Sequence, residues 1–295
     1  MPWLAFTLVL ALGADALCTY VLIPRGTTGR IQRLLRSDDP DEVGVFGSSR
    51  AEGNYVPDLL GAHVYDYGLS GTGFEVLAAL LDLELAKPKR APILINFDYD
   101  FFRSDLGDPT DYIPYYSQPA FRALMAQGGK DRLYFRVPGL RFVGTYEGYV
   151  KGFIESFGSP TKTFVRGAAL NKSPLTREQF LQFAAQRRAM HESFSAPPAM
   201  DARFQAMLAQ HRDRKVVLVV APYHRSVYDS VTNFSELRAY LSRLEQTHSN
   251  VITLYFDGST LADDEFYDTS HLNEAGARKF SLQLKQQLAE RGVQL

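Results

Sequence analysis

The chain has 295 residues, of which 45% are apolar and 22% are charged, and its formal net charge at pH 7 is −1. Because it carries no basic stripe with interleaved aromatic residues, no nucleic-acid partner is expected. Its single cysteine excludes an internal disulfide, and its six histidines lack the spacing of metal ligands, so neither a metal nor another cofactor is expected.

The first predicted element is an apolar helix at the N-terminus. Residues 3–23 contain one charged side chain, Asp15, and at ~1.5 Å per residue a helix of this length can cross a bilayer core of ~30 Å. We therefore predict an uncleaved signal-anchor (transmembrane) helix over residues 1–25. The alternative is a buried helix of a globular domain, which the presence of Asp15 favours. Arginines follow the segment and none precedes it, so the positive-inside rule would place the main domain in the cytoplasm.

A polar linker is predicted over residues 26–41, with two turns of amphipathic helix, and a main domain over residues 42–292. Within this domain five short apolar runs are expected to be strands, at residues 42–46, 63–67, 92–97, 215–220 and 251–256. The last three runs are almost continuously apolar, which is typical of parallel strands covered on both faces. Helical periodicity marks the residues around 74–85, 234–244 and 272–288. The predicted fold is α/β, a three-layer α/β/α sandwich with about five parallel strands.

Residues 99–211 interrupt this alternation. They contain a stretch rich in Tyr, Phe and Pro, then helical patterns, and no clear strand. We expect a helical and aromatic insertion over the carboxyl edge of the sheet, where open α/β sheets bind ligands and a lid would be useful. The simpler interpretation is that most of these aromatic residues pack the insertion's own small core.

Three segments carry residues suited to chemistry. Ser49 follows the first predicted strand, within Gly47-Ser48-Ser49, where it could be a nucleophile or merely the cap of a helix. Asp268 and His271 lie three residues apart before the last helix, so the carboxylate could orient the imidazole, although Asp268 could also cap that helix. Gly71 ends a glycine-containing turn after the second strand, and the N–H groups of such a turn can face a reacting oxygen.

Taken together, the three segments resemble the sequence blocks of the SGNH, or GDSL-like, hydrolase family, over roughly residues 42–290. Gly47-Ser48-Ser49 is similar to the first block, with Ser48 in place of its usual aspartate. Such variants occur in envelope relatives that act with teichoic-acid D-alanylation and polysaccharide acetylation. Asp268 and His271 match the DxxH block, and Leu-Asn-x-x-Gly follows it. The resemblance implies a flavodoxin-like sandwich with a Ser-His-Asp triad.

For the oxyanion hole, the resemblance implies the backbone N–H groups of Ser49 and Gly71. The family's third block, Gly-x-Asn-Asp, has no match here, because residues 96–100 read Asn-Phe-Asp-Tyr-Asp. The side-chain donor of that block is therefore out of place, and Asn96 or the Tyr99 hydroxyl could substitute for it. Losing one such donor typically lowers the rate by ~10²–10³.

Two further residues are candidates for binding substrate. Arg50 follows the nucleophile and could contact an anionic or acyl-donor group, or it could be an ordinary first-turn surface arginine. His224 follows the fourth strand and could line the substrate cleft, or it could be a hydrogen-bonded loop histidine.

The function that the resemblance implies is an envelope esterase or O-acyltransferase. It would hydrolyse or move a small acyl group, acetyl in the simplest case, on a glycan or lipid-linked glycan. The N-terminal helix would anchor the protein in the membrane, where a membrane acyltransferase would be a natural partner. The main domain would lie outside the cytoplasm, in conflict with the positive-inside rule. The alternative is an inactive scaffold of this fold in a polysaccharide modification or export complex.

Overall fold

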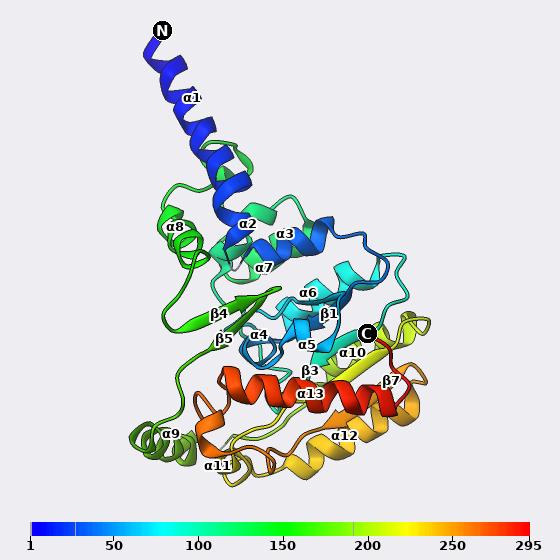
Figure 1. Ribbon diagram of the computed structural model, residues 1–295. Coiled ribbons are helices and arrows are strands. Elements are labelled where there is room, and N and C mark those ends of the chain that lie inside the picture. The colour runs from blue at the N-terminus through cyan, green and yellow to red at the C-terminus, as the bar shows by residue number, and fades with distance from the viewer. Residues whose placement is uncertain (1, 27, 191) are drawn as a thin grey trace. The chain divides into compact units, whose positions relative to one another are not determined.

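The computed structural model describes residues 2–26, 28–190 and 192–295 (Figure 1). These residues form two compact units. One consists of residues up to 37 together with residues 106–159, and the other consists of residues 38–105 together with residues 160–295. All the candidate site residues belong to the second unit.

A five-stranded parallel sheet forms the centre of the second unit, and this confirms the predicted α/β class. The strands stand in the order β2-β1-β3-β6-β7, so β1 and β3 lie inside the sheet and β7 lies at one edge. Each differs from its predicted range by no more than two residues at either end. The bounds are β1 Val43–Phe46, β2 Val64–Asp66, β3 Ile93–Asn96, β6 Val216–Val220 and β7 Val251–Tyr255.

Helices cover both faces of the sheet, which completes the three-layer sandwich (Figure 1). One face packs against α13 and two short helices, and the other packs against three longer helices joined by an aromatic cluster. The bounds are α4 Ser49–Asn54, α5 Pro57–Leu60, α13 Glu274–Glu290, α6 Phe74–Leu85, α10 Pro198–Gln210 and α12 Phe234–Thr247.

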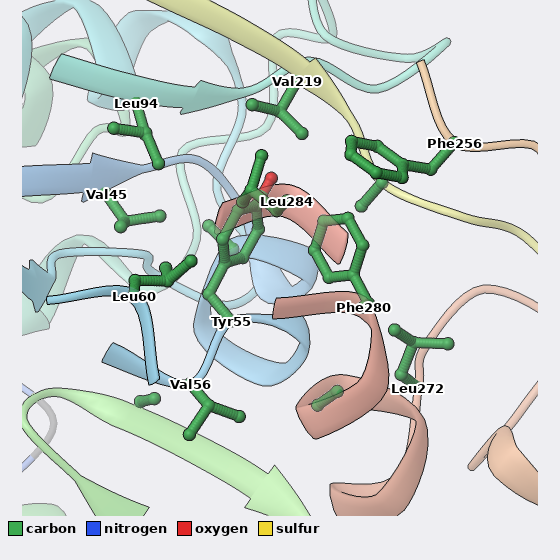
Figure 2. Packing of buried hydrophobic residues seen from close by; sticks show 14 of the residues in the cluster. Val45, Tyr55, Val56, Leu60, Leu94, Val219, Phe256, Leu272, Phe280 and Leu284 are labelled. Atoms are coloured by element: carbon green, nitrogen blue, oxygen red, sulfur yellow. The ribbon is translucent and has the colours of Figure 1, made fainter. Parts of the chain in front are cut away.

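The core beneath α13 explains why the strands read as apolar runs. Val45, Leu94 and Val219 point from three neighbouring strands toward Tyr55 and Phe280, and all five are at most 1% exposed (Figure 2). At about 25 cal/mol per Å² of apolar surface, each such side chain contributes roughly 1.5–3 kcal/mol relative to an exposed position. This burial fixes the strand ends, and with them the positions of the loops that follow.

A β-hairpin that the sequence did not suggest lies within the stretch expected to be an insertion. Its strands are β4 Lys162–Val165 and β5 Ala168–Asn171, joined by a two-residue turn of Arg166 and Gly167, both at positive φ. The turn pairs with the edge of β2, since the Asp66 N–H donates to the Arg166 carbonyl at 2.9 Å. A Cβ on Gly167 would lie 2.0 Å from the Asp66 carbonyl oxygen, so this contact requires glycine.

The remaining elements of the second unit are short or peripheral. They are α9 Arg177–Met190, α11 Arg225–Tyr228 and the 3₁₀ turn η4 Asp263–Glu265.

The other unit contains the N-terminal helix. A continuous helical stretch over Pro2–Arg25 is long and apolar enough to cross a membrane. It consists of α1 Pro2–Leu17, the π-helical turn η1 Cys18–Leu22 and α2 Ile23–Arg25. The amphipathic helix expected in the linker is present as α3. The other elements are α3 Gly29–Arg36, η2 Pro109–Tyr115, α7 Pro119–Gln127, η3 Leu133–Arg136 and α8 Tyr146–Glu155.

Candidate active site

Ser49 occupies a sharp strand-to-helix turn. Strand β1 ends at Phe46, Gly47 has φ +149°, Ser48 is extended, and Ser49 is the first residue of α4. A Cβ on Gly47 would lie 2.9 Å from the Ala51 side chain, so a larger residue would push the helix away from the strand. The turn therefore holds the Ser49 side chain at the carboxyl edge of a central strand, where it is partly exposed to solvent.

Asp268 and His271 lie on a tight loop before α13. The Asp268 carboxylate accepts hydrogen bonds from the backbone N–H groups of Ser270 at 2.6 Å and His271 at 2.8 Å. Asn273 then caps α13 by accepting from the Gly276 N–H at 3.1 Å. A Cβ on Gly276 would lie 2.1 Å from the Glu265 carbonyl oxygen, which explains the glycine of the Leu-Asn-x-x-Gly segment.

The three side chains form a continuous hydrogen-bonded line. Ser49 Oγ lies 2.8 Å from His271 Nε2, and His271 Nδ1 lies 2.8 Å from Asp268 Oδ2 and 3.0 Å from Oδ1. The side chains of His271 and Asp268 are 23% and 21% exposed, so the line is neither sealed in the core nor lying free on the surface. The proximity expected from the order of the three segments is therefore present.

The charge on Asp268 fixes the tautomer of the imidazole. Burial opposes ionisation of this carboxyl, but the bonds from the His271 ring and the backbone N–H groups outweigh it and hold its pKa below the usual value. An ionised carboxylate only accepts hydrogen bonds, so Nδ1 carries the proton and donates it. The lone pair of Nε2 is then free to accept the Ser49 hydroxyl proton.

The turn after β2 packs on the first turn of α4. The Leu69 N–H donates to the Gly47 carbonyl at 3.0 Å, and the Ser70 N–H and hydroxyl both donate to the Glu52 carboxylate. Gly71 follows at φ +74° and is exposed. In the part of the chain that the structure describes, the N–H groups of Ser49 and Gly71 donate to no protein acceptor. They are thus free to donate to a bound group.

Arg50 is neither a surface arginine nor open to a substrate, contrary to both of its interpretations. It is 4% exposed, and it donates to the carbonyls of Ser270 at 2.9 Å, Ala221 at 2.7 Å and Pro222 at 2.9 Å. It also forms an ion pair with Asp98. The guanidinium carbon lies 3.4 Å from the centre of the Tyr223 ring. Arg50 therefore holds together α4, the loop of His271 and the end of β6.

His224 also does not line a cleft. It is 1% exposed, its Nδ1 accepts from the Ser226 N–H at 3.2 Å, and its Nε2 donates to Asp263 at 3.1 Å. Burial lowers the pKa of this imidazole, although the hydrogen bond to Asp263 opposes the shift, so the neutral form dominates at pH 7. The backbone N–H of His224 donates to the Thr269 carbonyl at 3.1 Å, which ties the loop of His271 to the loop that follows β6.

Both proposed substitutes for the missing oxyanion donor are buried. The Asn96 side chain is 1% exposed, its Nδ2 donates to Asp98 at 2.8 Å, and its Oδ1 accepts from Tyr55 at 3.0 Å. Tyr99 is 7% exposed, and its ring packs against those of Tyr223 and Phe234. Both are structural residues of the β3 edge.

Sequence reasoning missed two carboxylates that position the site. Asp98 accepts from Arg50, Asn96 and Tyr223, and also from the Ser48 hydroxyl at 3.2 Å. Glu52 holds the turn that presents Gly71. Asp98 and Glu52 are at most 6% exposed. The position of Asp98, directly after a predicted buried strand, is the sequence feature that could have identified it.

Comparison with known proteins adds little to this geometry. No protein-family model and no curated protein matches the chain. A solved structure of a proposed platelet activating factor from Streptococcus pneumonia is similar at 14% sequence identity, with a TM-score of 0.44. The alignment covers 90% of this chain and 94% of that one.

Proposed function

We propose that this protein is a serine-dependent acyl-ester hydrolase or O-acyltransferase of the SGNH type. The observation that carries the proposal is the line from Ser49 Oγ through the His271 ring to the Asp268 carboxylate, with both links at 2.8 Å. A serine hydroxyl is a weak nucleophile at neutral pH, and a base within hydrogen-bond reach is the usual means of activating it.

In the proposed reaction, Ser49 Oγ attacks the carbonyl carbon of an acyl ester while its proton passes to His271 Nε2. The ester bond then breaks, the leaving alcohol takes that proton, and the acyl group stays on Ser49. In the second half, water or a sugar hydroxyl loses its proton to His271 and attacks the acyl-serine; the bond between the acyl carbon and Ser49 Oγ then breaks, and Ser49 takes the proton back from His271. Asp268 stabilises the imidazolium that forms in each half.

The charge that develops on the carbonyl oxygen would be met by the backbone N–H groups of Ser49 and Gly71. Asn96 is 1% exposed and its amide donates to Asp98, so this side chain does not join them there. The loss of one donor typically costs ~10²–10³ in turnover, so we expect slow ester hydrolysis.

The substrate and location follow from the family resemblance and the N-terminal helix together. We propose that α1 anchors the protein in a membrane and that the acyl group, acetyl in the simplest case, is exchanged on an envelope glycan or a lipid-linked glycan outside the cytoplasm. The length and apolar character of Pro2–Arg25 support the anchor.

A fluorophosphonate probe tests the enzymatic proposal. It should label the wild-type protein but not Ser49→Ala. Ser48→Ala is the matched control, since the neighbouring hydroxyl bonds Asp98 and not His271, and it should label like wild type. If folded wild-type protein takes up no label and cleaves no ester, the second candidate holds. That candidate is an inactive scaffold in a polysaccharide modification or export complex, and the engagement of Asn96 favours it.

A further inference from the structure

Exposed apolar side chains are concentrated in one unit of this protein. Among the described residues, nearly all large apolar side chains that are exposed lie either in residues 3–21 or in residues 133–157. The exceptions are Phe164, Leu181, Tyr267 and Leu282. That segment, which we name the 133–157 face, runs from η3 through a series of turns into α8. Its exposed apolar members are Leu133, Tyr134, Val137, Leu140, Val143, Val150, Ile154 and Phe157.

The 133–157 face is joined to the N-terminal helix at a defined level. The Asp15 carboxylate accepts from Arg141 Nε at 2.8 Å and Nη2 at 2.6 Å, and from the Gly139 N–H at 3.0 Å. Arg141 also donates to the Thr19 hydroxyl at 2.7 Å. A Cβ built on Gly139 would lie 3.2 Å from the Ala11 side chain, so this turn rests directly on α1.

The level of this contact constrains how the helix meets a bilayer. The part of the helix before its contact with the 133–157 face is Pro2–Leu10. These nine residues, at ~1.5 Å each, cover only about 14 Å. A hydrocarbon core is ~30 Å thick. The helix therefore reaches across the core only if the turns packed on Ala11–Thr19 enter the same bilayer. The ion pair with Arg141 neutralises the one acid of the apolar run, as membrane burial requires.

The chemistry of the 133–157 face suits the boundary between headgroups and acyl chains. Backbone N–H groups in its irregular part donate to carbonyls within the same segment, as a lipid environment requires. Examples are the bonds from the Val137 N–H to the Tyr134 carbonyl and from the Leu140 N–H to the Val137 carbonyl. Four exposed cations lie beside the apolar residues, namely Lys130, Arg132, Arg136 and Lys151, against three exposed acids, Asp131, Glu147 and Glu155. Long basic side chains at such a position can extend to anionic phosphates.

We propose that the 133–157 face is a lipid-binding surface that lies in the interfacial layer of the bilayer that α1 enters. It would hold α1 and its own unit at a fixed depth on an anionic membrane. This inference rests on the proposed membrane attachment through α1. Lipid, rather than a second copy, is the occupant we infer because the turn at Gly139 and Arg141 packs directly on the exposed apolar helix.

Depth-dependent quenching tests this in the full chain. In a Cys18→Ala background, bimane is attached to Leu140→Cys or Ile154→Cys, and the protein is reconstituted in phosphatidylglycerol–phosphatidylcholine vesicles. Leu8→Cys reports the anchor itself, and Leu282→Cys, 54% exposed on α13, is the control for an apolar position of the other unit. Nitroxide lipids and aqueous iodide are the two quenchers.

We expect nitroxide lipid to quench the labels at 140 and 154 strongly and iodide to quench them several-fold less than the label at 282. If the labels at 140 and 154 stay open to iodide while the label at 8 is in lipid, the inference is wrong and the anchor stands. If the label at 8 also fails to reach lipid, the membrane attachment itself is wrong. Shielding of 140 and 154 from both quenchers would show that a second copy covers the face, which also overturns the proposal.

Discussion

The buried ion pair between Arg50 and Asp98 gives a prediction whose size follows from its contacts. Arg50→Met removes the ion pair and the bonds to the Ser270, Ala221 and Pro222 carbonyls, and it leaves a carboxylate with 6% exposure without its cation. Breaking such a pair costs about 3–5 kcal/mol. The remaining bonds to Asp98 from Asn96, Tyr223 and Ser48 place the expected loss at the lower end of that range, about 3 kcal/mol.

A double-mutant cycle separates the interaction energy of the Arg50–Asp98 pair from the contributions of their other hydrogen bonds. Asp98→Asn keeps an oxygen that accepts from Arg50, so its cost alone should be smaller, about 2 kcal/mol. Once the carboxylate is gone, Arg50→Met leaves no buried charge behind. The double variant should therefore be more stable than the sum of the single effects predicts, by about 1.5–3 kcal/mol.

The free energy of unfolding can be followed by far-UV circular dichroism in detergent micelles. Arg278→Met is the matched control, because Arg278 pairs with Glu274 on the surface of α13 and is 50% exposed. Its loss should cost no more than about 0.5 kcal/mol. Additive effects of the Arg50 and Asp98 variants, within about 0.5 kcal/mol, would show that the two side chains do not interact in the folded protein.

Three further predictions concern the loop of His271 and its supports. Asp268→Asn should lower ester turnover by about 10⁴-fold with little change in melting temperature, because an amide can donate to Nδ1 and stabilise the wrong tautomer; unchanged turnover would contradict this role. Gly276→Ala should lower stability by about 1–3 kcal/mol in thermal melts, because its Cβ would meet the Glu265 carbonyl, and a neutral result would exclude that crowding. Burial lowers the pKa of His224 below its unfolded value of 6.5, so as pH falls below 6.5 the unfolded chain binds a proton that the folded chain does not, and stability falls by up to about 1.4 kcal/mol per pH unit. In His224→Asn, which can still cap the helix, melts between pH 7 and 5 should show a flatter decline, and an unchanged slope would assign the effect elsewhere.

The strands and the three side chains in line were predictable because both depend on local pattern. A parallel strand buried on two faces must be apolar along its length, and the residues that follow such strands must meet at one edge. Their positions therefore place Ser49, Asp268 and His271 at that edge, and the resemblance to the SGNH family singles them out as a triad. The glycine at 276 is required because a Cβ there would lie only 2.1 Å from the Glu265 carbonyl oxygen.

The partners of Arg50 were not predictable for the opposite reason. Its acceptors on Asp98, Ser270 and Ala221 lie 48, 220 and 171 residues away, and nothing near position 50 distinguishes a buried arginine from a surface one. The hairpin of β4 and β5 is likewise stabilised by contacts distant in sequence, such as that of Gly167 with β2. Long-range polar contacts leave no periodic signal in a single sequence.

The nucleophilic role of Ser49 is tested most directly by trapping the acyl-enzyme. The protein is mixed with p-nitrophenyl acetate, quenched in acid within the first turnover and digested, and the peptide that contains residues 47–50 is sequenced by mass spectrometry. Our account predicts one acetyl group on the Ser49 side chain, none on Ser48, and none in His271→Ala. Release of p-nitrophenol without an acetylated Ser49, or acetylation that persists when His271 is removed, would contradict it.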